Sequence, residues 1–585
     1  SLALGDVATF NRYASTSTNA KEFQKRTFFY GQDTWRATNK LTLNLGVRWE
    51  YYFPETVNGA KQGALLNMSD GYLHVAGVGG IGTNMDWEAR KLHQFEPRIG
   101  IAYQLNEKTV VRGGYGRSFD IGVFGSIFGH TVTQNLPVLA HQSLSNAADS
   151  NTGVAFCLGS DADNPGCAGG ANWSGSNPTG SVTVPVTGGP IPQLFPSVPS
   201  NGLLPNPGTN TTSIARQNPL RFPTLDAWNV SFQRALTPTM SLTLTYVGNK
   251  GTNTLSDGDG NNTNTNEAAI NLPGSTMAYG QTLSSITGQA IHYDPSASSG
   301  SLPDANGATS NQNLLQRYYG GALPACGGPC LWTQGIQFDG DDQNTNFNAL
   351  QVVLQQQQWK GLAMTANYQW ASAFDEAGQY ATWSKRVAYG RDSAVRQNAF
   401  TAYGSYQLPF GHGKKFMGGA NKGEDLLLGG YEVSSTVNIS SGLPMTLSFN
   451  CNGEIPGSVP CYPNKTGARL KTALNSFDAT TQTRTFFSAQ TIGGGIFSDP
   501  GVDNIGNNGR NTYWGPSFWN TDISVQKTFA IWEKVALKAR ADAYNALNHI
   551  NPNNPQTNIQ SAGTINGEAP GPGPRYLELS LKATF

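Results

Sequence analysis

Apolar and polar residues alternate along the segment 41–51, which reads Leu-Thr-Leu-Asn-Leu-Gly-Val-Arg-Trp-Glu-Tyr. The odd-numbered positions hold Leu, Val, Trp and Tyr, whereas the even-numbered positions hold Thr, Asn, Gly, Arg and Glu. A β-strand sends successive side chains to opposite faces. This rhythm of two therefore predicts a strand with one apolar face and one polar face.

The same rhythm recurs along the chain and predicts a series of β-hairpins. The predicted strand pairs cover 24–36 with 40–52, 96–105 with 108–119, 224–236 with 239–249, 345–358 with 362–374, 396–408 with 430–442, and 518–529 with 534–546. A last strand is predicted at 576–585. The total is about 13 strands, each about as long as a tilted strand must be to cross a bilayer.

The predicted connections alternate between short turns and long loops. Asn106-Glu107, Thr237-Pro238 and Lys360-Gly361 are short turns within hairpins. The connections between hairpins are long, and they cover 53–95, 120–222, 250–344, 375–395, 443–517 and 547–575. Outer-membrane β-barrels have short periplasmic turns and long extracellular loops. The pattern predicts an all-β fold, an antiparallel transmembrane β-barrel, in which the long link 409–429 is an exception among the periplasmic turns.

The composition suits a sheet with one wet face and one apolar face. Only 13% of the residues are charged, yet the hydrophobic fraction is 38% and the mean hydropathy is −0.36. No apolar run approaches the roughly 18 residues that a membrane-spanning helix needs, which excludes a helical membrane protein. A closed barrel also satisfies its backbone hydrogen bonds inside a bilayer. The formal net charge of zero offers no basic surface for nucleic acid.

The six cysteines fall into three local pairs in segments rich in Gly, Pro and Asn. The pairs are Cys157/Cys167, Cys326/Cys330 and Cys451/Cys461. Closely spaced cysteines in loops predict disulfides formed in an oxidising compartment. Zinc binding at the Cys326/Cys330 pair is the alternative, but no second Cys or His pair lies nearby to complete four ligands.

Six charged residues fall on the polar faces of the predicted strands, and we expect them to face the lumen. They are Arg48, Glu50, Arg112, Lys538, Arg540 and Asp542. They suit a hydrated lumen wall with paired charges, and contact with a plug domain or a solute is the second interpretation.

Nothing in the sequence resembles an active site, so we expect no enzyme, no catalytic residue and no cofactor. The seven His residues are scattered, and no Gly-x-Ser-x-Gly elbow appears. Asp257-Gly-Asp-Gly-Asn261 has the oxygen ligands of a calcium loop, but Ala268 stands where the closing Glu belongs. A solvated turn fits that segment better, and the same holds for Asp339-Gly-Asp-Asp342.

Several segments together resemble the barrel of Oar-like TonB-dependent receptors. They are Tyr30–Trp35 running into Leu41–Glu50, Pro97–Tyr103, Val111–Gly116, Trp228–Arg234, Tyr246–Thr252, Asn348–Val352, Leu408–Gly411, Ser441–Pro444 and Ala541–His549. The resemblance extends over nearly the whole chain, chiefly its strands. The final strand also resembles the C-terminal signal that outer-membrane proteins present to their assembly machinery, with Leu577, Leu579, Leu581 and Phe585 on one face.

This resemblance implies a barrel of about 22 strands, a plug domain inside it and a periplasmic TonB box. The chain begins Ser1-Leu2, without an initiator Met or a secretory signal, and neither a plug nor a TonB box precedes its first predicted strand. We therefore expect residues 1–585 to be the C-terminal portion of such a barrel. The first strand would then be an exposed edge.

The resemblance also implies a function, a cellular location and partners. We expect a receptor in the cell outer membrane of a Gram-negative-type bacterium, which transports a ligand too large or too scarce for porins. Long loops on a rigid sheet would capture that unknown ligand. The expected partners are outer-membrane lipid, the TonB complex through the plug region, and the barrel-assembly machinery. A passive porin-like channel and a surface adhesin or structural barrel are the alternatives.

Overall fold

A computed structural model of the chain describes the thirteen predicted strands and much of the loops. The described residues are 6–7, 9–17, 19–89, 94–122, 124–145, 156–157, 195–206, 213–255, 319–332, 335–376, 387–451, 461–475, 477–493, 495–501, 504–532, 535–571 and 573–585. In these ranges no helix combines the length and the apolar character needed to cross a membrane.

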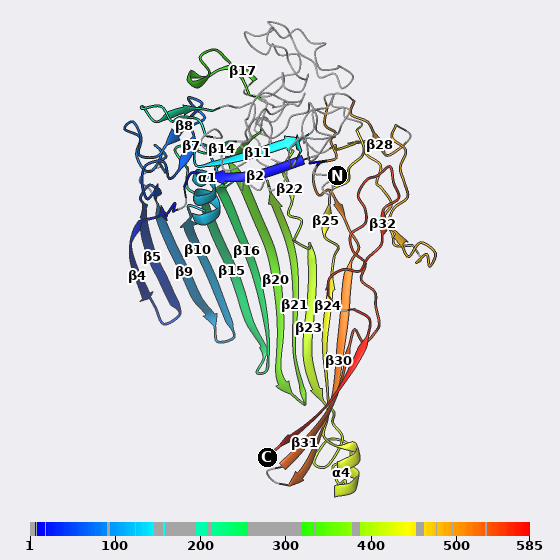
Figure 1. Ribbon diagram of the computed structural model, residues 1–585. Coiled ribbons are helices and arrows are strands. Elements are labelled where there is room, and N and C mark those ends of the chain that lie inside the picture. Colours follow the sequence, from blue (N-terminus) through cyan, green and yellow to red (C-terminus); the bar gives the residue numbers. More distant parts are fainter. Residues whose placement is uncertain are drawn as a thin grey trace.

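One large antiparallel sheet, here called the wall, dominates the structure (Figure 1). Its strands are β4 (Arg26–Arg36), β5 (Leu41–Tyr52), β9 (Phe95–Asn106), β10 (Thr109–Phe119), β15 (Thr224–Thr237), β16 (Met240–Thr254), β20 (Gln343–Trp359), β21 (Leu362–Asp375), β23 (Asn398–Gln407), β24 (Tyr431–Ser440), β30 (Phe518–Trp532), β31 (Val535–Tyr544) and β33 (Tyr576–Thr584). Each of these thirteen pairs with the next in the chain, and the short β22 (Gly390–Arg391) pairs with β21 beside this path. Every hairpin predicted from the alternation is confirmed.

The register of the wall gathers the apolar positions of all its strands on one face. Leu45 pairs with Ile99 across β5 and β9, and Leu350 pairs with Trp370 across β20 and β21. Directly paired residues share a face of the sheet. These side chains are exposed, Leu45 and Leu350 each by 42%. An apolar surface that runs across a whole sheet marks contact with something other than water.

The wall is open at both edges. Among the strands that the structure describes, β4 pairs only with β5, and β33 pairs only with β31. All eleven residues of β4 and all nine of β33 are exposed. The expected exposed edge at the first strand is therefore present. Because β4 and β33 are the first and the thirteenth in a row of successively antiparallel strands, they run in the same direction.

The two ends of the wall differ, and we name them the turn end and the loop end. At the turn end, Lys360 (φ 51°) and Gly361 (φ 90°) both adopt the left-handed conformation that a two-residue hairpin turn requires. The exception to the short connections at the turn end is the link 408–430 between β23 and β24, which contains the helix α4 (Lys422–Leu428). In Figure 1, α4 and the C-terminus lie together at the turn end.

The loops pack into two caps at the loop end. The first cap holds a five-stranded sheet of β13 (Leu203–Pro205), β8 (Tyr72–Val75), β7 (Ala64–Leu66), β14 (Ser213–Arg216) and β19 (Ile336–Asp339), together with the π-helical turn Phe124–Gly129 and α1 (His130–Thr133). Trp87, Leu66 and Leu220 are fully buried there. Beside it, β2 (Thr9–Ser15) pairs with β11 (Leu139–Ser145).

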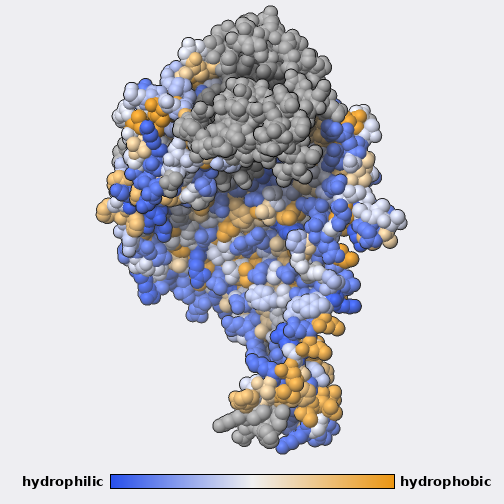
Figure 2. Space-filling model, viewed as in Figure 1, coloured by the Kyte–Doolittle hydropathy of each residue, from blue (hydrophilic) through white to orange (hydrophobic). Residues whose placement is uncertain are grey.

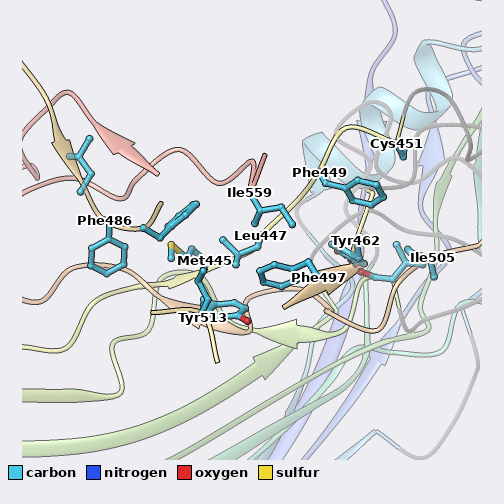
Figure 3. Packing of buried hydrophobic residues seen from close by; sticks show 14 residues of the cluster. Met445, Leu447, Phe449, Cys451, Tyr462, Phe486, Phe497, Ile505, Tyr513 and Ile559 are labelled. Atoms are coloured by element: carbon cyan, nitrogen blue, oxygen red, sulfur yellow. Dashed lines mark hydrogen bonds between the residues drawn. The ribbon is translucent and has the colours of Figure 1, made fainter. Parts of the chain in front are cut away.

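The second cap is built from the loops after β24 and after β31. Its buried cluster includes Met445, Leu447, Phe497 and Ile559, which point toward one another in Figure 3. Three small strand pairs support it: β25 (Pro444–Met445) with β29 (Tyr513–Trp514), β26 (Asn464–Lys465) with β28 (Phe497–Ser498), and β27 (Arg484–Thr485) with β32 (Thr564–Ile565). The compact hydrophobic cores of this chain thus lie in its caps rather than in its wall.

Three further strand pairs lie among the loop segments. They are β1 (Asp6–Val7) with β12 (Phe156–Cys157), β3 (Glu22–Phe23) with β6 (Thr56–Val57), and β17 (Tyr319–Ala322) with β18 (Pro329–Leu331), the last pair joined through a 3₁₀ turn at Pro324–Cys326.

Candidate functional site

The face of the wall opposite the apolar one is polar, and we call it the inner face. It carries a hollow of about 610 Å³ that is lined by residues of β4, β5, β9, β10, β15, β16 and β20. Five glycines line it: Gly46, Gly100, Gly114, Gly116 and Gly248. The register places the first four on the inner face, because Gly46 and Gly116 both pair with Arg98, and Gly100 pairs with Gly114. Gly248 instead pairs with Trp228. The other inner-face residues that line it are Gln32, Asn44, Arg98, Ala227, Asn229, Val247, Asn249 and Phe347.

The glycines of the hollow are not all required by packing within the wall. A β-carbon added at Gly116 would meet only the carbonyl oxygen of Pro97, at 4.0 Å, and one at Gly46 would have ordinary contacts of 3.5 Å or more. At Gly114 the nearest atom would be the side-chain nitrogen of Asn229, at 3.1 Å. A glycine in a strand interior often marks a site where a ligand or another backbone approaches closely. The hollow is suited to such an approach.

Arg48 and Glu50 form an ion pair on the inner face near the loop end. The Nε of Arg48 donates a hydrogen bond of 2.6 Å to Oε1 of Glu50 and lies 3.7 Å from a carboxylate oxygen of Glu96. The Tyr52 hydroxyl also donates to Glu50, and the Arg48 guanidinium lies 4.0 Å above the Phe28 ring. The Arg48 guanidinium therefore lies close to two buried carboxylates, those of Glu50 and Glu96. The sequence predicted two of these charges but missed Glu96.

The other predicted lumen charges lie on the inner face in two places. Arg112 donates a 2.8 Å hydrogen bond to the side-chain oxygen of Gln233. On β31, Arg540 and Asp542 form an ion pair of 2.8 Å. The register sets Lys538 directly opposite Lys582. Like charges that face each other across a sheet repel. Together with Arg540 and Asp542, these two lysines concentrate charged side chains at this edge of the inner face.

The first cap contains a buried histidine that the sequence did not single out. The His74 side chain lies between two carboxylates, with Nε2 2.9 Å from Asp70 and Nδ1 3.0 Å from Asp86. Asp339 and Asp341 are buried, so the interpretation of the segment 339–342 as a solvated turn was wrong, and Asp341 accepts two hydrogen bonds from the Arg221 guanidinium. In the described part of the chain, no three His, Cys, Asp or Glu side chains come together as a metal site.

Two of the three predicted cysteine pairs are disulfides in the structure. Cys326 and Cys330 are joined with their Cα atoms 5.3 Å apart, and Cys451 and Cys461 with theirs 6.0 Å apart. Cys157 lies in β12, but Cys167 falls outside the described residues. The segment 257–261, weighed as a calcium loop, also lies outside them.

Residues 1–578 match the family described as the outer membrane beta barrel domain. The chain belongs to the outer membrane beta barrel domain family. The location in the outer membrane, expected from the sequence, is confirmed. In such barrels the short turns are periplasmic and the long loops are extracellular. The caps of this outer membrane barrel domain are therefore extracellular, its apolar face contacts lipid and its inner face lines the lumen.

Solved outer-membrane receptors are similar to this barrel domain at low identity. The ferripyoverdine receptor of Pseudomonas aeruginosa is 9% identical, with 97% of this chain and 39% of that chain covered and a TM-score of 0.38. The ferric preacinetobactin receptor BauA of Acinetobacter baumannii is 10% identical, with coverage of 97% and 44% and a TM-score of 0.36. The ferric citrate transporter FecA is 8% identical, with coverage of 97% and 45% and a TM-score of 0.35. The chain spans less than half the length of these relatives, and no curated protein matches it.

The last strand of the barrel domain presents its apolar residues to the lipid side. Leu577, Leu579 and Leu581 are 70%, 81% and 69% exposed, and Phe585 is 95% exposed. The register places Leu579 opposite Ala541, on the same face as the apolar positions of the rest of the wall. The residues predicted as an assembly signal are thus accessible at a free edge.

Proposed function

We propose that this chain is part of the wall of a TonB-dependent receptor of the Oar-like type, which takes up a ligand too large or too scarce for porins. The observation that carries the proposal is the glycine-lined hollow on the inner face. A plug domain inside the barrel must contact the inner face closely. Glycines that have no packing role within the wall allow the backbone of such a domain to approach.

The direction of the edge strands supports a larger barrel. A closed antiparallel barrel needs neighbouring strands of opposite direction, and bacterial outer-membrane barrels have even strand numbers. Since β4 and β33 run in the same direction, they cannot close the wall by pairing antiparallel with each other. An odd number of further strands between them would close it, and about 22 strands in total would meet that condition.

The extracellular caps are the proposed site of ligand capture. Each cap has its own buried core, so the loops form shaped surfaces on a rigid wall. The lumen charges Arg48, Glu50, Arg112, Lys538, Arg540 and Asp542 would face the plug or the passing ligand. The proposed partners are outer-membrane lipid, the TonB complex acting through the plug, and the assembly machinery acting on the last strand.

Cysteine accessibility in living cells tests this function. Gly116→Cys places a thiol in the hollow, at a position where a β-carbon has room. Lys471→Cys in the second cap is a matched control, because Lys471 is exposed and extracellular. Full-length protein in the outer membrane would be labelled with a membrane-impermeant maleimide, with and without a protonophore, and the labelling of the wild type would be subtracted.

We expect Gly116→Cys to label slowly in resting cells, faster in energised cells that contain TonB, and slowly again after the protonophore. Lys471→Cys should label quickly under every condition. Fast labelling of Gly116→Cys regardless of energy would overturn the proposal in favour of a passive channel. Slow labelling regardless of energy would overturn it in favour of a structural barrel or adhesin.

A further inference from the structure

The link 408–430 is the one long connection at the turn end of the described wall, and it folds into a small unit of its own. The helix α4 begins with a capping box, in which the Asn421 side chain accepts from the backbone nitrogens of Gly423 and Glu424, and Glu424 accepts from the backbone nitrogen of Asn421. The Asp425 carboxylate accepts a 2.6 Å hydrogen bond from the backbone nitrogen of His412. The link is therefore held in a defined shape.

Lys527 fixes this unit against the lipid side of the wall. Its Nζ donates hydrogen bonds to the carbonyl oxygens of Gly429, at 2.5 Å, and Leu427, at 3.2 Å, at the end of α4. The register places Lys527 opposite Tyr431, on the same face as Val525, which is 40% exposed on the apolar side. A cation at a helix C-terminus is favourable. The end of α4 thus continues the lipid-facing surface at its periplasmic rim.

The unit presents six large apolar side chains that remain 39–69% exposed, although Phe410 and Phe416 stack on each other at 5.5 Å. The exposed fractions are 42% for Phe410, 46% for Phe416, 39% for Met417, 50% for Leu426, 69% for Leu427 and 50% for Leu428. Figure 2 shows hydrophobic residues gathered at this end of the molecule, where Figure 1 places α4. Water is an unfavourable neighbour for so many adjacent apolar groups.

Basic residues stand beside this apolar surface. Lys414, Lys415 and Lys422 are exposed, and none of them has an ion-pair partner within the part of the chain that the structure describes. The two acidic residues of the link, Glu424 and Asp425, are engaged in the hydrogen bonds described above. Exposed Leu and Phe residues next to lysines are the combination that binds in the interface of an anionic membrane.

We propose that the link 408–430 is an interfacial anchor that inserts its apolar residues into the periplasmic leaflet and binds anionic phospholipid headgroups through Lys414, Lys415 and Lys422. Three observations converge: the unit joins the lipid-facing surface through Lys527, its apolar residues remain largely exposed, and the charges of the link that are outside hydrogen bonds and ion pairs of the described chain are positive. The anchor depends on the outer-membrane location and not on TonB-driven transport.

Lipid-quenching fluorescence on full-length protein in vesicles tests the anchor. A single environment-sensitive dye would be attached at Leu427→Cys, at Leu350→Cys in the lipid-facing belt, or at Lys471→Cys in the extracellular cap. Vesicles would contain phosphatidylcholine with or without phosphatidylglycerol, and nitroxide lipids with the quencher near the headgroup or deep in the acyl chains. Dye attached to unmodified protein gives the background.

We expect the Leu427→Cys dye to be quenched by shallow nitroxides, the Leu350→Cys dye by deep ones, and the Lys471→Cys dye by neither. Phosphatidylglycerol should strengthen the quenching at Leu427→Cys. Replacing Lys414, Lys415 and Lys422 by Gln should weaken binding of the link to anionic lipid roughly fivefold per lysine and remove the difference between the two vesicle types.

Two outcomes would overturn the anchor. One is a Leu427→Cys dye that behaves like the Lys471→Cys dye, since the link would then face water. The other is a Leu427→Cys dye whose emission reports an apolar environment but which neither nitroxide lipid quenches. In that case protein, and not lipid, would cover the apolar surface of the link. Because the Leu350→Cys dye reports correct insertion of the barrel in the same sample, a misfolded preparation cannot be mistaken for either result.

Discussion

Arg216 and Glu55 form an ion pair in which each side chain is only 1% exposed. Arg216 belongs to β14 in the first cap, whereas Glu55 follows the wall strand β5. The guanidinium also donates to the Ile121 carbonyl oxygen at 3.2 Å and lies 4.0 Å above the Trp87 ring. The Gln24 side chain donates to Glu55 at 3.1 Å. This pair therefore joins two connections, the one after β5 and the one after β10, with the segment before β4, and it ties the cap to the wall.

Replacing Arg216 by Met should loosen the first cap. The change leaves the Glu55 carboxylate buried without its cation, and breaking a buried ion pair in this way costs about 3–5 kcal/mol. Hydrogen exchange of residues 64–75 in the full-length protein would measure the loss. Arg112→Met is the control, because Arg112 is exposed and hydrogen-bonded only to Gln233 among the described contacts, and it should cost about 1 kcal/mol or less. Equal effects of the two variants would contradict the structural role of the pair.

The stability of the first cap should fall as the pH rises above the ordinary range of a carboxyl group. Burial raises the pKa of Glu55 above its ordinary value of 4.5, against the lowering effect of Arg216. A raised pKa means that the folded cap favours the protonated form, so this contribution is present below the ordinary value and lost as the pH passes through the raised value.

The measurement is exchange protection of the cap between about pH 4 and about pH 7, corrected for intrinsic rates. Glu55→Gln cannot titrate, so it should show a smaller decline than the wild type. Burial also raises the pKa of Glu22, which is present in both proteins, so the difference between them reports Glu55 together with its charge repulsion from Glu22. Parallel curves would show that Glu55 does not contribute.

An arginine on the lipid face should destabilise the wall far more than one on the inner face. Leu350 and Gln351 are neighbours on β20 that face opposite sides, and Gln351 donates a 3.0 Å hydrogen bond to Gln369 on the inner face. Leu350→Arg should cost about 2–4 kcal/mol near the bilayer midplane, and Gln351→Arg about 1 kcal/mol or less. Guanidinium unfolding of reconstituted full-length protein would measure both. Similar costs would mean that the faces are assigned wrongly.

Replacing Phe585 by Ala should reduce assembly of the barrel in the outer membrane several-fold. Phe585 is 95% exposed at the end of the free-edge strand, where the proposed assembly signal is accessible. Thr584→Ala is the matched control, because the alternation puts Thr584 on the inner face. The amount of folded protein in outer-membrane fractions, read from its unheated gel mobility, separates the two. An equal yield of both variants would mean that Phe585 is not part of the proposed assembly signal.

The strands were predictable because their signal is local. Leu43, Leu45 and Val47 report their common face through spacing alone, and the structure confirms that face by pairing them with Ile101, Ile99 and Pro97. Partners across strands were harder to predict. Glu96 joins Arg48 only because β5 and β9 pair in one particular register.

The hollow and the caps could not be predicted from the sequence. Gly46, Gly100 and Gly114 look like ordinary small residues along the chain, and only the pairing of three strands brings them together. Trp87 and Leu447 lie in loops whose sequences have no periodic pattern, so their burial could not be predicted from neighbouring residues. The sequence predicted a long link at 409–429, but nothing in the sequence predicted its helix α4 or the contact of that helix with Lys527.

By itself, the sequence determined which segments are strands, which way each side chain faces and in what order the strands follow, because a repeat of two residues acts between near neighbours. Only the tertiary structure decided that the described wall does not close on itself, that glycines from several strands line one hollow, and that the end of α4 lies on the lipid side. Those properties depend on strand pairing and packing between residues far apart in the chain. The two-residue alternation of apolar and polar positions carries no information about such contacts.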